Sequence, residues 1–284
     1  MNLLLVADLS ALLVDLDAEG AALDSLLIAM PTESWSLPTP SDGWNIAFQV
    51  AHLAWTDEAS LLAVVDEAAF LAEAETLLAQ PKGFIDRTAA VNAELSPEEL
   101  LVLWRTGRAS LSTALAQVVE GRKLKWFGPS MSAASMATAR LMETWAHGYD
   151  IADALEVRPV PTARLRHVAH IGVRTRDFAF TANKLEVPTE EFRIELDTAG
   201  LDAAGVSSQQ WVWGPEGAAQ RVSGSALDFC LLVTQRRHLE DLDLVSVGTQ
   251  AARWLTIAQT FAGPVGGGRA AGQFAQQQPE GGNL

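Results

Sequence analysis

The sequence predicts a two-domain α plus α/β protein, in which a four-helix bundle is followed by a small α+β domain. Long amphipathic helical patterns fill about the first 158 residues, and shorter segments with strand-like alternation follow them. The segment "VRPVPTA" (157–163), with its two prolines, is the expected linker. The 284-residue chain is 49% hydrophobic and 19% charged, so it is long enough to bury a core in each half. We therefore expect domains over residues 1–158 and 159–268.

The first half carries four helical patterns. They are expected over residues 3–30, 44–79, 96–120 and 131–156. In the first pattern, leucines recur at spacings of three, four and seven residues, and the acidic residues fall on another face. The third begins at "SPEEL", where Ser96 is the expected N-cap, Pro97 the first helical residue and Glu99 the capping-box partner. Four such helices in about 155 residues are typical of a bundle.

The second half mixes helix and strand patterns. A helix is expected over 164–184, and strands are expected at "FRIEL", "QQWVW" and "LDLVSV", the first two joined by the Gly-rich "DTAGLDAAGV". Ser225 and Asp228 are expected to cap the helix "LDFCLLVTQRR", and a last helix is expected from Thr249 to a C-cap at Gly263. The Gly- and Gln-rich segment 269–284 is expected to be a disordered tail.

The charge of the chain is concentrated in its first third. Residues 1–81 contain 13 Asp or Glu and no Lys or Arg, whereas the other 203 residues are nearly balanced. A phosphate backbone requires a cationic surface, so a nucleic-acid partner is not expected. The single cysteine, Cys230, excludes an internal disulfide and a cysteine-based zinc knuckle. Because acidic residues interrupt the apolar N-terminus and no apolar run approaches the roughly 20 residues that cross a bilayer, we expect a cytoplasmic protein without a membrane partner.

The stretch "ARLMETWAHGYD" (139–150) is the first candidate site. Arg140, Glu143, His147 and Asp150 are spaced three or four residues apart, so they lie within a sector of about 80° on a helix. One interpretation is a solvated ladder of charges whose pairs contribute a few tenths of a kcal/mol each. The other is that Glu143 and His147 are two metal ligands that need a third from elsewhere in the chain.

His52 supplies that third ligand under the second interpretation. It lies on one helical stripe with Phe48 and Trp55, so it should face the interior of the bundle. A core histidine with one hydrogen bond is the simpler alternative. In helix bundles, however, metal sites are built from inward residues on facing helices. His52, Glu143 and His147 would form a three-ligand site for zinc or a similar divalent ion, with an open coordination position.

Other candidate sites receive less support from the sequence. His167 and His170 are three residues apart, but neighbouring arginines oppose a cation there, and His238 is expected at a helix end. Cys230 lies among apolar residues and is expected to be buried and inert. The segment "GPVGGGR" follows no strand and lacks the GK[ST] of a phosphate loop, and no serine lies in a GxSxG motif.

The motifs also carry a family resemblance. "GW…AHLAW" followed by "ARLMETWAHGYDIADAL" resembles the mycothiol-dependent maleylpyruvate isomerase-like proteins of the DinB superfamily. "WFGPSMSAASMATARLMETWAHG", "VSGSALDFCLLVTQRR" and "WLTIAQTFAGP" are similar to an uncharacterised, actinobacterial-type metal-binding branch of that group. The resemblance implies a DinB-like four-helix bundle that holds a divalent metal, usually zinc, through His52, Glu143 and His147. Many DinB relatives have a third His where this chain has Glu143.

The resemblance further implies thiol chemistry. In the family the thiolate of mycothiol attacks an electrophilic carbon, which gives cis–trans isomerisation or transfer of sulfur. On this basis Arg140 is expected to anchor a carboxylate of thiol or substrate, and Asp150 to orient His147 or polar groups of the thiol. A plain intrahelical pair is the alternative for both. Arg236 and Arg237 are expected to close the site from the second domain as cofactor-binding residues.

The sequence therefore predicts a metal- and mycothiol-dependent isomerase or S-transferase with a small-molecule substrate. Two alternatives remain open at this point: hydrolysis by metal-activated water, and binding of a metal or small molecule without catalysis. The identity of the substrate depends on the shape of loops such as 31–44 and 121–131. A homodimer is one of the oligomeric states that the sequence leaves open.

Overall fold

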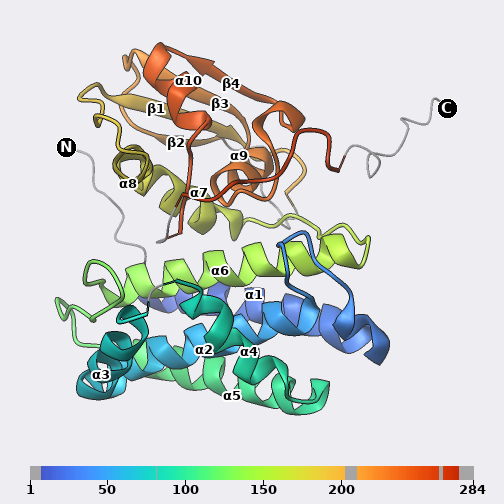
Figure 1. Ribbon diagram of the computed structural model, residues 1–284. Coiled ribbons are helices and arrows are strands. Elements are labelled where there is room, and N and C mark those ends of the chain that lie inside the picture. The colour runs from blue at the N-terminus through green and yellow to red at the C-terminus, as the bar shows by residue number, and fades with distance from the viewer. Residues whose placement is uncertain (1–7, 81, 202–209, 262–264, 275–284) are drawn as a thin grey trace. The chain divides into compact units, whose positions relative to one another are not determined.

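The computed structural model describes residues 8–80, 82–201, 210–261 and 265–274 (Figure 1). The chain divides into two compact units, Met1–Arg158 and Pro159–Leu284. Over the described residues, the first unit is helical and the second combines helices with a four-stranded sheet. The predicted fold class, a helical bundle followed by an α+β part, is therefore confirmed.

The first unit is built on four long helices. These are α1 (Leu9–Ala29), α2 (Ile46–Val65), α5 (Pro97–Ala116) and α6 (Ala133–Ala154). Two shorter helices, α3 (Glu67–Leu78) and α4 (Phe84–Ala93), and a 3₁₀ turn, η1 (Thr32–Ser36), complete the unit. Figure 1 shows the long helices stacked side by side, and α2 packs against α3, α4, α5 and α6.

Local sequence explains where these helices begin. The Ser96 hydroxyl accepts a hydrogen bond from the Glu99 amide, and the Glu99 carboxylate accepts one from the Ser96 amide, so the predicted capping box is confirmed. The side chain of Asn45 caps α2 in the same way, and that of Ser132 caps α6. Each side chain satisfies an amide that would otherwise lack a partner at the first helical turn.

The prediction of a single helix over 44–79 is wrong. Asp66 leaves the helical conformation (φ −145°, ψ 79°), ends α2, and accepts a hydrogen bond from the Ala69 amide as the N-cap of α3. Helix α4 was not predicted; it begins after Gly83, whose φ of 68° lies in the left-handed region that favours glycine. The sequence did not reveal this break, because the spacing of hydrophobic residues continues across Asp66 while the chain changes direction there.

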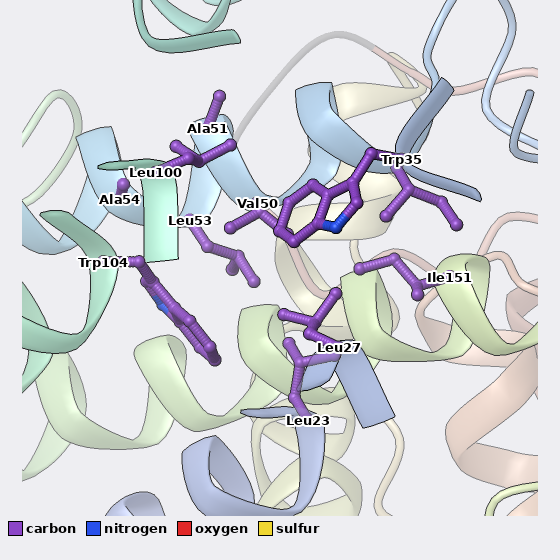
Figure 2. Close-up of a cluster of buried hydrophobic side chains, with 11 residues drawn as sticks. Leu23, Leu27, Trp35, Val50, Ala51, Leu53, Ala54, Leu100, Trp104 and Ile151 are labelled. Carbon is purple, nitrogen blue, oxygen red and sulfur yellow. The ribbon is translucent and has the colours of Figure 1, made fainter. Parts of the chain in front are cut away.

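The core of the first unit is aliphatic and aromatic. Figure 2 shows Leu23 and Leu27 of α1 converging on side chains from α2, α5 and α6. The indole of Trp104 is almost fully buried, and Trp35 of η1 covers one end of the cluster. The residues of this cluster are Leu23, Leu27, Trp35, Ile46, Val50, Ala51, Leu53, Ala54, Leu100, Trp104 and Ile151. Burial on this scale contributes roughly 1.5–3 kcal/mol for each large side chain.

The second unit is a small sheet with short helices. Its strands are β1 (Phe192–Asp197), β2 (Trp211–Trp213), β3 (Gln220–Ser225) and β4 (Leu244–Val247), in the order β2-β1-β3-β4. The pair β1–β3 is parallel and the other two pairs are antiparallel. The helices are α7 (Leu165–Arg174), α8 (Arg176–Ala182), α9 (Ala226–Val233) and α10 (Thr249–Leu255), with a 3₁₀ turn η2 (Leu239–Asp241).

The second unit contains the helices and strands that the sequence predicts, but several of them begin or end at other residues. The helix expected over 164–184 is interrupted at Thr175, and α10 ends at Leu255, whereas Gly263 lies outside the described residues. Strand β3 was not predicted. Ser225 caps α9 by accepting from the Asp228 amide, as expected. Most of the tail, residues 275–284, also lies outside the described residues.

None of the helices in the described parts of the chain combines the length and apolar character needed to cross a membrane.

We expect residues 1–158 to fold without the rest of the chain. The cluster in Figure 2 draws all of its side chains from this segment, so a shortened chain would retain every residue of that cluster. A protein of residues 1–158 should give a strongly helical circular dichroism spectrum and a single cooperative thermal transition. A chain that is insoluble, or helical without a cooperative transition, would show that the two units share a core.

Candidate metal centre

Three side chains that can bind a metal converge in the bundle. His52 comes from the middle of α2, and Glu143 and His147 come from consecutive turns of α6. One ligand atom from each of the three lies within 4.8 Å of the others. Glu143 Oε2 lies 3.0 Å from His147 Nε2 and 3.5 Å from His52 Nε2. The spacing of four residues on α6 accounts for the first distance, and the packing of α2 on α6 accounts for the second.

The triad is enclosed on one side and open on the other. His52 is buried, whereas the side chains of Glu143 and His147 keep 22% and 12% of their surface exposed. Solvent therefore reaches part of the Glu143 and His147 side chains. A centre of this kind, with three protein ligands and an accessible side, has the arrangement of a catalytic rather than a structural zinc site.

The electrostatics of the triad fit a cation. Burial acts to raise the pKa of Glu143, but the hydrogen bonds and charges of His147 and His52 outweigh it and hold that pKa well below its usual range. Glu143 is therefore ionised at neutral pH. A carboxylate oxygen and the lone pairs of two neutral imidazoles are all electron donors, so their convergence requires a positive charge between them, either protons or a metal ion.

Aromatic rings hold the two imidazoles in place. The ring of Trp44 is stacked on His147 at a centroid distance of 6.0 Å and lies 5.3 Å from the ring of His52. Trp55, one turn along α2, lies 5.9 Å from His52 on another side. The Nδ1 atom of His52 is buried and has no hydrogen-bond partner among the described residues, so this ring is oriented by its aromatic neighbours and by the contact of Nε2 with Glu143.

Sequence reasoning missed Gln49, which is fully buried beside the triad. His147 Nδ1 is hydrogen-bonded to Gln49 Oε1, and Gln49 Nε2 donates to the Thr39 hydroxyl at 2.8 Å. One available signal was the position of Gln49 three residues before His52, which places both on one face of α2.

Arg140 and Asp150 lie in the interior, 2% and 0% exposed, so the interpretation of 139–150 as a solvated charge ladder is wrong. Arg140 Nε donates to Asp57 Oδ1 at 2.8 Å, and Asp57 is itself buried on α2. Burial raises the pKa of Asp57, although the guanidinium of Arg140 acts to lower it. Asp150 accepts a hydrogen bond from the Ser41 hydroxyl at 3.0 Å. The sequence had predicted neither Asp57 nor Ser41 as a partner.

The remaining candidates lie in the second unit: His167 and His170 are on α7, Cys230 is on α9, and Arg236, Arg237 and His238 follow α9. Arg236 Nη1 donates to the Thr234 carbonyl, and the guanidinium of Arg237 lies 3.7 Å from the centroid of the Phe274 ring. Their assignment to the cofactor stays a prediction. Cys230 is buried, as expected, and burial raises the pKa of its thiol well above the usual value, which disfavours the reactive thiolate.

A cleft of about 430 Å³ opens beside the triad. It is lined by Asp42, Gly43, Trp44, Phe48, Asp86, Arg87 and Ala90. Trp44 belongs to both features, because its ring contacts the two imidazoles and its Nε1 donates to Asp86 Oδ1 at 2.9 Å. The two guanidinium Nη atoms of Arg87 donate to the carbonyls of Lys82 and Gln80. The cleft therefore combines an aromatic wall with the carboxylates of Asp42 and Asp86.

Comparisons with known proteins identify similar domains and a similar fold. Residues 16–152 match the model of the mycothiol maleylpyruvate isomerase N-terminal domain, and residues 204–247 match a model described as wyosine base formation. The crystal structure of a mycothiol-dependent maleylpyruvate isomerase has a TM-score of 0.54 to this chain at 18% identity, and a mutant of it has 0.56. Both cover 84% of this chain and 92% of the solved one, and at this identity they show a shared fold.

Two proteins of Mycobacterium tuberculosis, from strains CDC 1551 and H37Rv, are 55% identical to the chain over 264 residues. The match covers 93% of this chain and the whole of each relative, and both are described as uncharacterized. The chain thus belongs to one family with these mycobacterial proteins. Its helical first unit, in which His52, Glu143 and His147 lie together, matches the mycothiol maleylpyruvate isomerase N-terminal domain over residues 16–152.

Proposed function

We propose that the protein is a divalent-metal-dependent enzyme that uses mycothiol in an isomerase or S-transferase reaction on an electrophilic small molecule. The observation that carries the proposal is the convergence of His52, Glu143 and His147 in a bundle that matches the mycothiol maleylpyruvate isomerase N-terminal domain. The relatives with solved structures are described as mycothiol-dependent isomerases, which supports thiol use here. The thiol part of the proposal rests on the family match, and the metal part rests on the three converging side chains.

The donor set suits zinc. Two imidazoles and one carboxylate are common zinc ligands, and Glu143 is the one anionic member of the triad. A bound divalent ion lowers the pKa of a coordinated thiol and keeps it as the nucleophilic thiolate near neutral pH. Since Glu143 neutralises only half of a 2+ charge, the site would remain attractive to an anionic sulfur.

The cleft beside the triad is the proposed place for the rest of the ligand. Its aromatic wall, formed by Trp44 and Phe48, suits the apolar face of a ligand, and the carboxylates of Asp42 and Asp86 suit hydroxyl donors. Arg87 already donates from both of its Nη atoms to backbone carbonyls. The cleft therefore favours a neutral, hydroxyl-bearing ligand body over an anionic one.

The contacts of Arg140 and Asp150 support positioning roles for both. Arg140 joins α6 to α2 through its buried pair with Asp57. Asp150 holds Ser41, and thereby the loop that carries Asp42 and Trp44 into the cleft. Through these contacts the two residues would support the triad and the cleft without touching substrate. The proposal that Arg236 and Arg237 bind the cofactor rests on the family resemblance alone.

The metal proposal makes a prediction about ligand removal. The purified protein should carry about one divalent ion per chain, and His52→Ala should remove it, because two ligands bind zinc far more weakly than three. Glu143→Gln keeps the shape but removes the anion, so metal retention should also fall. Elemental analysis and native mass spectrometry measure both, and His170→Ala, in the second unit, is the matched control. Wild-type protein that stays metal-free after loading with zinc would return His52 to the role of a core histidine.

The reaction proposal makes a prediction about requirements for turnover. With maleylpyruvate as the probe substrate, conversion followed by absorbance should require both added mycothiol and bound metal, and His52→Ala should abolish it. Turnover that depends on metal but not on thiol would indicate hydrolysis by metal-activated water instead. Metal and thiol binding without conversion of this or other electrophilic probes would indicate a binding protein.

The positioning role of Arg140 makes a prediction about stability. Arg140→Ala should lower the free energy of unfolding by about 3–5 kcal/mol, because it leaves the Asp57 carboxylate buried without its partner. The double variant Arg140→Met, Asp57→Leu removes both charges and should recover most of that loss. Urea denaturation measures the two values. A single variant as stable as wild type, with weakened thiol binding, would restore Arg140 to the carboxylate-anchoring role.

A further inference from the structure

We infer that Gln49, held by Thr39, is a positioning residue that fixes the tautomer of His147 and directs its Nε2 lone pair into the triad. The relevance of this tautomer to metal binding rests on the proposed function. The tautomer itself follows from the hydrogen bonds and can be measured without a metal.

The donor and the acceptor can be assigned for each hydrogen bond that links Trp44, Thr39, Gln49 and His147. The Thr39 hydroxyl lies 2.9 Å from the Trp44 carbonyl oxygen, which can only accept, so the single hydroxyl proton is used there. Toward Gln49, 2.8 Å away, Thr39 must therefore accept, which places the amide NH₂ of Gln49 on that side. The carbonyl oxygen of Gln49 then faces His147 Nδ1. Because a carbonyl oxygen cannot donate, Nδ1 must carry the proton.

The consequence lies on the other side of the imidazole ring. In a neutral imidazole with the proton on Nδ1, Nε2 has the lone pair. Nε2 is the atom of His147 that lies 3.0 Å from Glu143 Oε2. A metal ion that took the place of the proton between Nε2 and Glu143 Oε2 would leave the other proton on Nδ1, held by Gln49, so His147 is prepared as an Nε2 ligand.

The surroundings keep Gln49 from reversing its amide. Gln49 is fully buried, so water cannot replace either partner. A flipped amide would place NH₂ against the Nδ1–H of His147, and its carbonyl would compete with the Trp44 carbonyl for the single hydroxyl proton of Thr39. Thr39 is held in turn, because its amide donates to the Trp44 carbonyl at 2.8 Å and residues Pro38 and Asn45 form a β-bridge.

The second histidine of the triad lacks such a device. His52 Nδ1 is buried without a hydrogen-bond partner among the residues that the structure describes, and its ring is held by Trp44 and Trp55. Control of protonation by a hydrogen bond is therefore concentrated on His147. Loss of the Gln49 side chain should therefore weaken metal binding by the triad, although Gln49 is not itself a metal ligand.

The experiment measures the tautomer and the metal affinity separately. Ring ¹⁵N shifts of His147 in the metal-free wild-type protein, at a pH where the ring is neutral, should report the Nδ1–H form. Gln49→Leu should lose this preference and bind Zn²⁺ roughly 10–100-fold more weakly in a chelator competition. Gln49→Glu keeps an acceptor for Nδ1 and should retain both the tautomer and an affinity close to that of wild type. Thr39→Val, which leaves the Gln49 amide without its acceptor, should weaken Zn²⁺ binding in the same direction as Gln49→Leu, and Thr39→Ser should not.

Two results would overturn the inference: an Nε2–H form in the wild type, or Gln49→Leu and Thr39→Val that keep both tautomer and affinity. If Gln49→Leu does not fold, Thr39→Val and Gln49→Glu decide the question, because neither removes the buried side chain at position 49. If the wild type shows the Nδ1–H tautomer but binds no Zn²⁺, the inference stands and the proposed function fails. If the wild type binds Zn²⁺ and the tautomer is wrong, the function stands and the inference fails.

Discussion

The contact between α2 and α6 is the constraint on which the chemistry of the bundle depends. Both helices place ionisable side chains in the interior, where a charge or donor must find a protein partner. Asp57 of α2 meets Arg140 of α6, and Gln49 of α2 meets His147 of α6, about two helical turns away. The two helices are thereby tied at two polar points in antiparallel order. A shift that kept one contact would break the other and leave a buried charge or amide without its partner, so the same contacts that hold the helices together also fix the position of Glu143.

The parts of the site that the sequence predicted are those set by local geometry. The spacing of Glu143 and His147 on one helix determines their separation whatever surrounds them. The aromatic stripe around His52 predicted that its ring points inward, and the ring is indeed buried. The capping box at Ser96 is likewise a relation between residues three apart. The convergence of His52 with the other two needed the further assumption of a bundle, which the helical periodicity and the family resemblance both supplied.

What the sequence could not predict depends on partners distant in the chain. Asp57 lies 83 residues from Arg140, and no pattern in either helix identifies the pair, so Arg140 was assigned to an incoming carboxylate. The hydrogen bond between Gln49 and His147 spans 98 residues. The break at Asp66 was hidden because apolar spacing continues across it, and β3, "QRVSGS", is too polar and Gly-containing to read as a strand. For Arg140 and Gln49 a tertiary contact, not a local preference, decided the outcome.

Hydrogen bonds join the two parts of the candidate site, which lie on helices and on a loop. The metal-binding candidates lie on α2 and α6, whereas the cleft is lined by the loop before α2, by Phe48 of α2 and by α4. If loop and helices were independent, ligand preference could change without any effect on the triad. They are joined at two places: Thr39 holds Gln49, and Ser41 holds Asp150. A ligand that moves this loop would therefore also move Thr39, and through it the Gln49 amide that is hydrogen-bonded to His147. The hydroxyl groups of Thr39 and Ser41 thus connect the cleft to the helices that carry the triad.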